Sequence, residues 1–415
     1  HRPQDPCVDG ASAGLIEQVG GIDGDRGRTD GALGQAPPPD DAGRHRTGYR
    51  AHMTALAVLT SGGDAPGMNA AIRAVTKVAA SHNVPTWGVE NGYDGLIDGH
   101  FRPLIKRNRS GAPAPLHEVE SEGGEGGTIL GSSRSKRFYD RESRVAAARQ
   151  LEEYSITGVV VIGGNGSMAG VQALAAETDV PVVGIPASID NDIGLTREAL
   201  GVDSALNTIV EACDNISDTA RSHHRAFVVE VMGRQSGYLA MAAAVATAAD
   251  AVLLPERPHT RDEVIESVVR CIQNSFDTAR DKTRVLIIKA EGVPVPTHEI
   301  VEEATRLCGQ TGADYEIRSA VLGHVVRGGD ASFRDRLLAG RFGRVAVEAV
   351  LDANSNVMAG WNIGVDLGKP TTDDWIRLFD IPDVLTETEA LLDGSSSVSI
   401  ERVARMEAIQ GVLAL

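Results

Sequence analysis

The stretch VVVIGGNGSMAGVQAL, Val159 to Leu174, places an apolar β-branched run before a glycine-rich turn and a helical pattern. We expect a buried strand, a loop and a helix in that order. The turn GGNGS (Gly163–Ser167) suits a phosphate, because glycine lets the backbone approach an anion and a helix start offers unpaired N–H groups. A magnesium-assisted phosphate site would favour a carboxylate at Asn165, so the asparagine leaves open whether such a site catalyses or only binds.

The same alternation of apolar runs and helical stretches continues along the chain from Met53. It recurs in ALAVLT, VPVVGIPAS, AFVVEVMG and TRVLIIKAEG. Strands that are apolar on both faces and separated by helices form parallel sheets covered on both sides. The pattern predicts a doubly wound α/β architecture, in which ligands bind at the carboxyl ends of the strands.

Composition limits the classes of partner. The chain has 415 residues, 42% of them hydrophobic, and a net charge of −17, which argues against nucleic-acid and membrane-surface partners. No apolar run reaches the roughly 18 residues of a spanning helix. Residues 1–52 are rich in Gly, Pro, Asp and Arg and lack an apolar signal core, so we expect a disordered N-terminal tail. These features predict a soluble, cytoplasmic protein.

A second glycine-rich loop, TSGGDAPGMNAAIR (Thr60–Arg73), also lies between a predicted strand and a predicted helix. Its glycine order matches neither the dinucleotide fingerprint nor the Walker A pattern, so a tight turn without a ligand is the plain alternative. Two such loops in one sheet, however, fit a substrate whose polyphosphate tail lies across several strand ends.

Two carboxylates follow a third apolar run in PASIDNDIGLT (Pro186–Thr196). Asp190 and Asp192 are two residues apart, so in an extended segment they point the same way and share one pocket. One could accept a proton from an attacking hydroxyl and the other could help to hold magnesium. The alternative is a pair of turn and cap residues, which would be favoured for an isolated DND.

Arginines recur beside strands and glycine turns, where a guanidinium can form paired hydrogen bonds with phosphate oxygens. Taken singly, each is more often a solvated surface charge, and a lone histidine is more often structural. Glu291, in KAEGV, ends an apolar strand and could accept sugar hydroxyls; a helix-start carboxylate is the alternative. The candidate basic residues are Arg134, Arg225, Arg234, Arg318, His324 and Arg327.

Together, LTSGGDAPGMNAAIR, GGTILGSSR, GGNGS, PASIDNDI, VVEVMGR, KAEGV and VLGHVVRGG resemble the 6-phosphofructokinase family in order and spacing. The resemblance spans about Leu59 to about Arg336. It implies transfer of the γ-phosphoryl of ATP to the 1-hydroxyl of fructose 6-phosphate, in a homotetramer whose active sites are shared between subunits. It also implies two Rossmann-like domains with largely parallel sheets. The larger, nucleotide-binding domain would comprise 53–201 plus about 326–380, and the smaller, sugar-phosphate-binding domain 202–325 plus about 381–415.

The resemblance implies a role for each matching residue. Asp190 is expected to be the base, Arg234 to stabilise the transferring phosphoryl, and Asp192 to support Mg²⁺ together with Asn165. The expected ATP-binding residues are Gly63, Tyr93, Arg134, Gly164, Gly166 and Ser167. The expected sugar-phosphate residues are Ser188, Met232, Gly233, Glu291, His324 and Arg327, with Arg225 and Arg318 reaching in from the neighbouring subunit.

Three positions depart from the family's pattern. Asn165 stands where an aspartate usually holds magnesium, and an amide oxygen lacks the negative charge, so metal affinity should fall. Ser188 stands for the usual threonine and keeps the hydroxyl, and Val326 stands for a usual glutamine.

The phosphoryl donor is predicted from two small residues. Pyrophosphate-using relatives typically carry an acidic residue where Gly166 stands and a lysine where Ala187 stands, so ATP is favoured. A pyrophosphate-dependent enzyme is the alternative donor class. Asn165 motivates a second alternative, a sugar-phosphate-binding regulatory homologue with impaired catalysis. A Rossmann dehydrogenase is disfavoured because no dinucleotide fingerprint is present.

Overall fold

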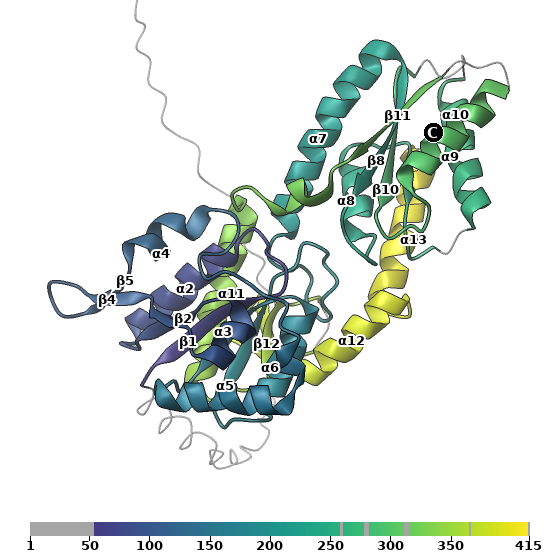
Figure 1. Cartoon of the computed structure of the whole chain (residues 1–415). Helices are drawn as coiled ribbons and strands as arrows, with labels where there is room; N and C mark the ends of the chain where they lie inside the picture. Colours follow the sequence, from purple (N-terminus) through teal and green to yellow (C-terminus); the bar gives the residue numbers. More distant parts are fainter. Residues whose placement is uncertain (1–53, 258–259, 278–281, 311–314, 365–366, 414–415) are drawn as a thin grey trace, which may run out of the picture. The chain divides into compact units, whose positions relative to one another are not determined.

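The computed structural model describes residues 54–257, 260–277, 282–310, 315–364 and 367–413. The predicted disordered tail, residues 1–52, lies outside this range. The described chain forms an eight-stranded sheet, a four-stranded sheet and a two-stranded ribbon, with helices packed around the two larger sheets (Figure 1).

The larger sheet has five parallel strands in its middle and antiparallel strands at its edges. Its central strands β1, β6 and β7 are entirely buried, because their apolar runs contact helices on both faces. In spatial order the strands are β13 (Lys369–Pro370), β14 (Ile376–Asp380), β12 (Val357–Trp361), β7 (Val182–Pro186), β6 (Val159–Gly163), β1 (Leu56–Ser61), β2 (Thr86–Val89) and β3 (Phe101–Pro103).

The direction of winding reverses between β1 and β6. From β1 the chain passes through α2 (Met68–Ser81) to β2, and from β6 it passes through α6 (Asn165–Ala175) to β7 on the other side. Right-handed crossovers in opposite directions place these two helices on opposite faces of the sheet. α11 (Phe333–Leu351) packs beside α2, whereas α5 (Arg141–Glu153) packs with α6 and α3 (Gly92–Asp98) (Figure 1). Ligands of such sheets bind at the strand ends beside this reversal.

The smaller sheet is parallel throughout, with the spatial order β11, β8, β10, β9. The chain leaves the larger sheet after β7, builds the smaller one, and returns to the larger one at β12. The elements of this part are α7 (Val202–His223), β8 (Arg225–Val231), α8 (Tyr238–Ala246), β9 (Ala251–Leu253), α9 (Arg261–Ser275), β10 (Val285–Ala290), α10 (Thr297–Gln310) and β11 (Glu316–Val321).

Two C-terminal helices complete the described chain. α12 (Ile381–Asp393) packs against α6 and β14, and α13 (Ser397–Leu413) packs against α8. The remaining short elements are β4 (Ile105–Arg107), β5 (Pro113–Pro115), α4 (His117–Ser121), η1 (Glu122–Gly124), η2 (Arg137–Tyr139) and η3 (Gly323–Arg327).

The α/β fold class with largely parallel sheets, predicted from the sequence, is confirmed. The exact boundaries of two domains stay a prediction. Among the described residues, no helix combines the length and apolar character needed to cross a bilayer.

Candidate active site

A cleft of about 420 Å³ opens at the carboxyl ends of β1, β6 and β7; we call it the main cleft. It lies beside the reversal in winding, where the fold favours a ligand. The candidate residues that line it are Gly63, Tyr93, Arg134, Gly164, Asn165, Gly166, Ser167, Ser188, Asp190, Asp192, Arg234 and Arg327. The structure therefore brings together the residues that were predicted for the nucleotide, the metal and the chemical step.

The loops after β1 and β6 leave room for an anion. A Cβ added to Gly63 would lie 3.2 Å from Arg327 Nη1 and 3.7 Å from Arg134 Nη2, so two guanidinium groups converge over this glycine. Gly166 faces open space, and Gly164 precedes α6 without a side-chain cap. The first N–H groups of a helix have no partner within it, so this end of α6 favours a phosphate group.

Ser167 and Tyr93 lie beneath the loop after β6. The Ser167 hydroxyl donates to the Ser61 carbonyl oxygen at 2.9 Å, and the Tyr93 hydroxyl donates to the Ser167 carbonyl oxygen at 2.8 Å. Burial raises the pKa of Tyr93 well above its usual value, so this hydroxyl stays a donor. Its ring stacks on Phe138 with the ring centroids 4.1 Å apart. Both residues thus hold the loop in shape from below.

Asp190 is a buried carboxylate between two arginines. It is 3% exposed, its Oδ2 lies 3.5 Å from Arg234 Nε, and its Oδ1 lies 3.7 Å from Arg327 Nη2. Burial, followed by the charge of Asp192, raises the pKa of Asp190 to about 6, against the opposing effect of the two arginines. At neutral pH the group is mostly ionised and can still accept a proton readily, which suits a general base.

Asp192, in the loop after β7, contacts Asn165, the first residue of α6. The Asn165 amide donates to the Asp192 carbonyl oxygen at 3.3 Å, and Ser188 donates to the Asp192 carboxylate at 3.2 Å. Burial raises the pKa of Asp192, while the hydrogen bond from Ser188 lowers it. The loop after β7 and the start of α6 are therefore fixed relative to each other at the place where metal ligands were predicted.

The donor set suits a magnesium ion that is shared with phosphates. Asn165 Oδ1 is buried and lacks a hydrogen-bond partner among the described residues, and Asp192 lines the same cleft. The same part of the chain holds no group of three His, Cys, Asp or Glu side chains that would bind a metal alone. Magnesium typically takes one or two protein oxygens together with substrate phosphates, and Asn165 and Asp192 fit that arrangement.

The loop after β8 carries Met232, Gly233 and Arg234. Glu291, which follows β10, accepts hydrogen bonds from the Gly233 N–H at 3.2 Å and from the Arg234 N–H at 2.6 Å. These bonds hold the backbone of Arg234 in the left-handed region, at φ 51°. Met232 is buried just before the turn, and the Arg234 side chain stays half exposed beside Asp190.

Six candidate residues do not line the main cleft: Arg225, Met232, Gly233, Glu291, Arg318 and His324. Arg225 begins β8, and Arg318 lies in the neighbouring strand β11, two residues after Glu316, the register partner of Arg225. Glu316 accepts hydrogen bonds from both guanidinium groups, so the three side chains form one group, which we call the arginine cluster. The side chain of Arg318 is 60% exposed, and His324 is also exposed.

Sequence reasoning missed one wall of the main cleft. Asp94 accepts hydrogen bonds from the hydroxyls of Ser133 and Ser135, which orders the segment around Arg134. The dense basic run SRSKR is a sequence signal for Lys136 as well as for Arg134. The missed lining residues are Ser133, Ser135, Lys136, Phe138, Tyr139, Arg144, Ala169, Gly170 and Ala173.

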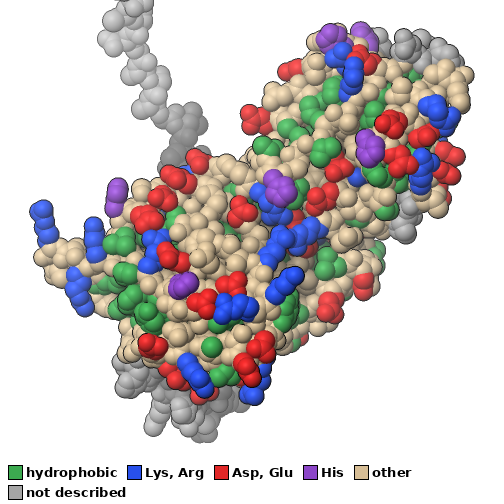
Figure 2. Space-filling model, in the orientation of Figure 1, with side chains coloured by type: hydrophobic (Ala, Val, Ile, Leu, Met, Phe, Trp, Pro, Cys, Tyr) green, Lys and Arg blue, Asp and Glu red, His purple; other side chains and the backbone are tan. Residues whose placement is uncertain are grey.

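The cleft is locally basic on an acidic protein. Arg134, Lys136, Arg144, Arg234 and Arg327 line it, although the whole chain carries a net charge of −17. On the face drawn in Figure 2, Lys and Arg side chains gather near the middle. Such a local excess of cations attracts phosphorylated ligands into a concave site.

Comparisons with known proteins agree with this geometry. Residues 55–350 match the family described as phosphofructokinase. An ATP-dependent 6-phosphofructokinase of Thermotoga neapolitana is 44% identical over 306 residues, which cover 74% of this chain and 89% of that protein. One from Lactobacillus acidophilus is 41% identical over 328 residues, which cover 79% of this chain and 94% of that protein.

A solved structure gives the same result. The phosphofructokinase of Pichia pastoris in the T-state matches with a TM-score of 0.73 and 28% identity. The match covers 86% of this chain and 42% of that chain, so this chain spans less than half of that protein's length. The resemblance inferred from the ordered motifs is thus confirmed, and the chain belongs to the phosphofructokinase family.

Proposed function

We propose that this chain is an ATP-dependent 6-phosphofructokinase that acts in cytoplasmic glycolysis. The 1-hydroxyl oxygen of fructose 6-phosphate forms a bond to the γ-phosphorus of ATP while the bond to the leaving oxygen of ADP breaks, giving fructose 1,6-bisphosphate. The observation that carries the proposal is the main cleft, where two glycine loops meet a buried carboxylate and a half-exposed guanidinium at parallel strand ends.

Asp190 would accept the proton of the sugar 1-hydroxyl as the new bond forms. Its burial supports this role, because it brings the carboxylate closer in proton affinity to the attacking group than a solvated aspartate would be. Arg234, 3.5 Å from Asp190, would stabilise the charge on the transferring phosphoryl group. Phosphoryl transfer depends mainly on positioning and charge neutralisation, and this pair supplies both.

The two glycine loops would bind the phosphates of ATP. Backbone N–H groups at Gly63, Gly164 and Gly166 would donate to phosphate oxygens, with Arg134 adding charge. Ser167 and Tyr93 would act from beneath, by fixing the loop. The cleft continues past Phe138, Tyr139, Ala169 and Ala173, which offer an apolar surface to the adenosine.

Mg²⁺ would be held by Asn165 Oδ1 and Asp192 together with phosphate oxygens. Both side chains lie at the loops that line the cleft, and the asparagine oxygen is buried without a hydrogen-bond partner among the described residues. When bound, the ion neutralises charge on the nucleotide phosphates. The neutral amide should lower magnesium affinity without removing the site.

Fructose 6-phosphate would bind beside Asp190. Glu291 uses Oε1 for the Gly233 and Arg234 N–H groups, and its second oxygen could accept sugar hydroxyls. The other contributing residues would be Ser188, Met232, Gly233, His324 and Arg327.

The arginine cluster would bind the 6-phosphate of a sugar held in a neighbouring subunit. Arg225 and Arg318 do not line the main cleft of their own chain, and Arg318 is largely exposed. A complete site would therefore need a second copy of the chain, which is consistent with a homotetramer.

The donor is proposed to be ATP. Gly166 faces open space, so the cleft has room for a nucleotide at the position where a larger side chain would crowd it. Purified protein should phosphorylate fructose 6-phosphate with ATP and excess magnesium, and should be much slower with pyrophosphate. Turnover with pyrophosphate alone would replace the donor assignment.

The asparagine at position 165 is the one observation that favours a second candidate function, that of a sugar-phosphate-binding regulator. That function predicts tight fructose 6-phosphate binding without turnover from either donor. The paired Asp190 and Arg234 argue against it, because a protein that only binds has little use for a buried base. Calorimetric binding measured beside the turnover assay separates the two.

A further inference from the structure

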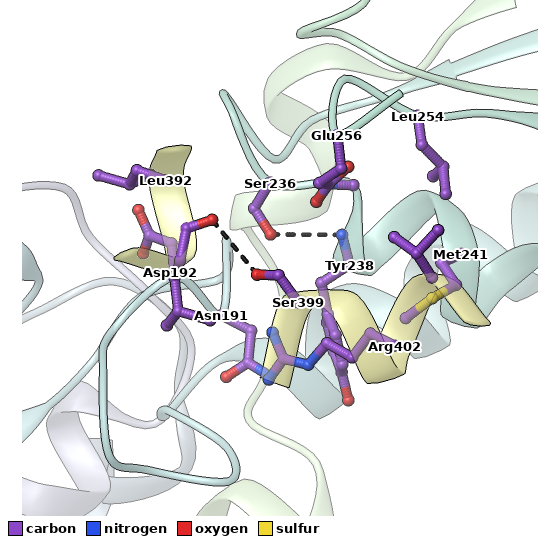
Figure 3. A pocket seen from close by; sticks show the side chains of 13 residues that line it. Asn191, Asp192, Ser236, Tyr238, Met241, Leu254, Glu256, Leu392, Ser399 and Arg402 are labelled. Carbon is purple, nitrogen blue, oxygen red and sulfur yellow. Dashed lines mark hydrogen bonds between the residues drawn. The ribbon is translucent and has the colours of Figure 1, made fainter. Parts of the chain in front are cut away.

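A small cavity of about 20 Å³ lies where the C-terminal helices α12 and α13 meet two loops, the one after β7 and the one after β8 (Figure 3). Asn191 and Asp192 line it from the loop after β7, and Ser236 and Gly237 line it from the loop after β8. Helices α8, α12 and α13 and the segment after β9 supply the remaining wall. A cavity of this size holds about one water molecule and no metabolite, so its lining residues form a packing contact between the loops and the helices, which we call the joint.

Each of these two loops contains a non-glycine residue whose backbone is in the left-handed region. Asn191 has φ 48° and Arg234 has φ 51°. Such backbone is unfavourable for residues with a Cβ and persists only where surrounding contacts over-determine it. Glu291 supplies two such contacts to the loop of Arg234. The C-terminal helices supply further contacts to both loops.

Helix α12 holds the loop that carries the two aspartates. The Gly194 N–H, two residues after Asp192, donates to Thr388 Oγ1 at 2.9 Å. Thr388 is 4% exposed, so this bond is shielded from water. A Cβ at Gly194 would lie 2.6 Å from the Val384 carbonyl oxygen, which shows how closely the helix backbone approaches the loop.

Helix α13 holds the loop that carries Arg234. The guanidinium of Arg402 lies over the Tyr238 ring, 4.8 Å from its centroid, and Glu256, which lines the same cavity, attracts it electrostatically. Glu256 accepts a hydrogen bond from the Gly237 N–H at 2.7 Å. Within the same loop, the Ser236 N–H donates to the Gly233 carbonyl oxygen. Contacts therefore run from Arg402 to the residue beside Arg234.

Glu256 shows why a cation is needed at this joint. Its Oε2 is buried and has no hydrogen-bond partner among the described residues. A Cβ at Gly237 would lie 2.4 Å from the same oxygen, so the carboxylate is pressed against the loop backbone. A buried carboxylate oxygen is costly unless a positive charge lies near it, and Arg402 is the cation that lines the same cavity.

We propose that Arg402 is a positioning residue for the transfer reaction: by docking α13 on Tyr238 and Glu256, it keeps the Arg234 loop in its strained, working conformation. The inference rests on the proposed function, because its main readout is the rate of transfer. If Arg402 contributed only to helix packing, its substitution would lower the melting temperature, and the rate measured well below that temperature would not change.

The test compares Arg402→Ala with Ile400→Ala. Ile400 lies on the same helix, is 58% exposed and does not line the cavity, so the control shortens a side chain of α13 without touching the joint. With ATP and fructose 6-phosphate, Arg402→Ala should lose about 10- to 100-fold in kcat with little change in KM for ATP, because small displacements of a catalytic group have effects of this size. Ile400→Ala should match the wild type.

A double-mutant cycle with Glu256→Gln strengthens the test. If Arg402 acts through Glu256, the double variant should lose little more kcat than the worse single variant. Arg402→Lys keeps the charge, should retain part of the rate, and replaces the alanine variant if that one does not fold. Unchanged kcat in Arg402→Ala, or an equal loss in Ile400→Ala, would overturn the inference.

Hydrogen exchange separates this inference from the proposed function. Amides of residues 231–238 should exchange faster in Arg402→Ala than in Ile400→Ala, whether or not the wild type turns over fructose 6-phosphate. A wild type without turnover would disprove the proposed function alone. Equal exchange in the two variants would contradict the positioning role.

Discussion

The main cleft and the arginine cluster contain the same kinds of charged group in opposite settings. In the cleft, Asp190 is 3% exposed and lies between two arginines of its own chain. In the cluster, one carboxylate, Glu316, is shared by Arg225 and Arg318, and the Arg318 side chain is 60% exposed. The cleft is preorganised within one chain, whereas the cluster leaves positive charge open to an anion from outside.

The two carboxylates show how setting decides their chemistry. Burial raises the pKa of Asp190 to about 6. Hydrogen bonds from Arg225 and Arg318 lower the pKa of Glu316, which has little burial to oppose them. Asp190 is thus suited to exchange a proton near neutral pH, while Glu316 stays ionised and holds two arginines in place.

The largest effect is expected from Asp190→Asn, which removes the proposed base of the cleft. We expect kcat to fall by about 10²- to 10⁴-fold, the usual contribution of a positioned base. Steady-state turnover with ATP and fructose 6-phosphate measures this. Asp179→Asn, at an exposed position, is the control. A loss below tenfold would remove Asp190 from the chemical step.

Arg318→Gln should weaken the binding of fructose 6-phosphate without affecting ATP, and so separate the roles of the two regions. Losing one charge-assisted contact should raise KM for fructose 6-phosphate about 10- to 100-fold. KM for ATP should stay unchanged, since Arg318 does not line the main cleft. Arg306→Gln, at another half-exposed arginine, is the control. A raised KM for ATP would contradict the separation.

The pH dependence should report the burial of Asp190. The proposed base accepts a proton only in its ionised form, so kcat/KM should fall about tenfold per unit as pH drops below about 6, the pKa of this carboxylate. A profile that stays flat down to pH 5 would show that no such group controls the rate.

The same pKa predicts a gain in stability for Asp190→Asn. The carboxylate titrates at about 6 when folded, against 3.8 ordinarily, so its ionisation opposes folding as pH rises between these values. At pH 7 the asparagine variant should therefore have an unfolding free energy that is higher by on the order of 3 kcal/mol, and a higher melting temperature. The advantage should shrink as pH falls from 6 towards 4 and disappear near pH 3, where the carboxyl is protonated in both the folded and the unfolded chain. An equal advantage at pH 7 and pH 3 would exclude this cause.

The smallest effect is expected from Asn165→Asp. A charged ligand should lower the magnesium concentration for half-maximal rate several-fold, with kcat altered little. Titration of the rate with magnesium at saturating ATP measures the shift. An unchanged titration would remove Asn165 from the metal site.

The sequence predicted the loops of the main cleft well because their signals are local. An apolar run followed by glycines indicates a strand end, and parallel strand ends meet at one edge of the sheet. Gly63, Gly164 and Asp190 were found in this way. The arginines were located as candidates, but nothing in the sequence showed that Arg327 would converge with Arg134 on Gly63.

Contacts between distant segments could not be predicted. Gly194 and Thr388 are joined by a hydrogen bond across 194 residues, and the helical pattern around Thr388 shows only that one side is buried. The same holds for Arg402 over Tyr238, and for Arg144 in the wall of the cleft. A side chain's partner depends on how elements pack, which a one-dimensional pattern does not encode.

Subunit complementation tests whether the main cleft of one chain and the arginine cluster of another form one active site. Asp190→Asn chains keep the arginine cluster and Arg318→Gln chains keep the main cleft, so co-assembled chains contain some sites with both parts intact. Turnover of fructose 6-phosphate with ATP, measured at a sugar concentration below the raised KM, should exceed the sum of the two variants. Co-assembled chains with no more activity than that sum would show that one chain supplies the whole site, and would contradict the account.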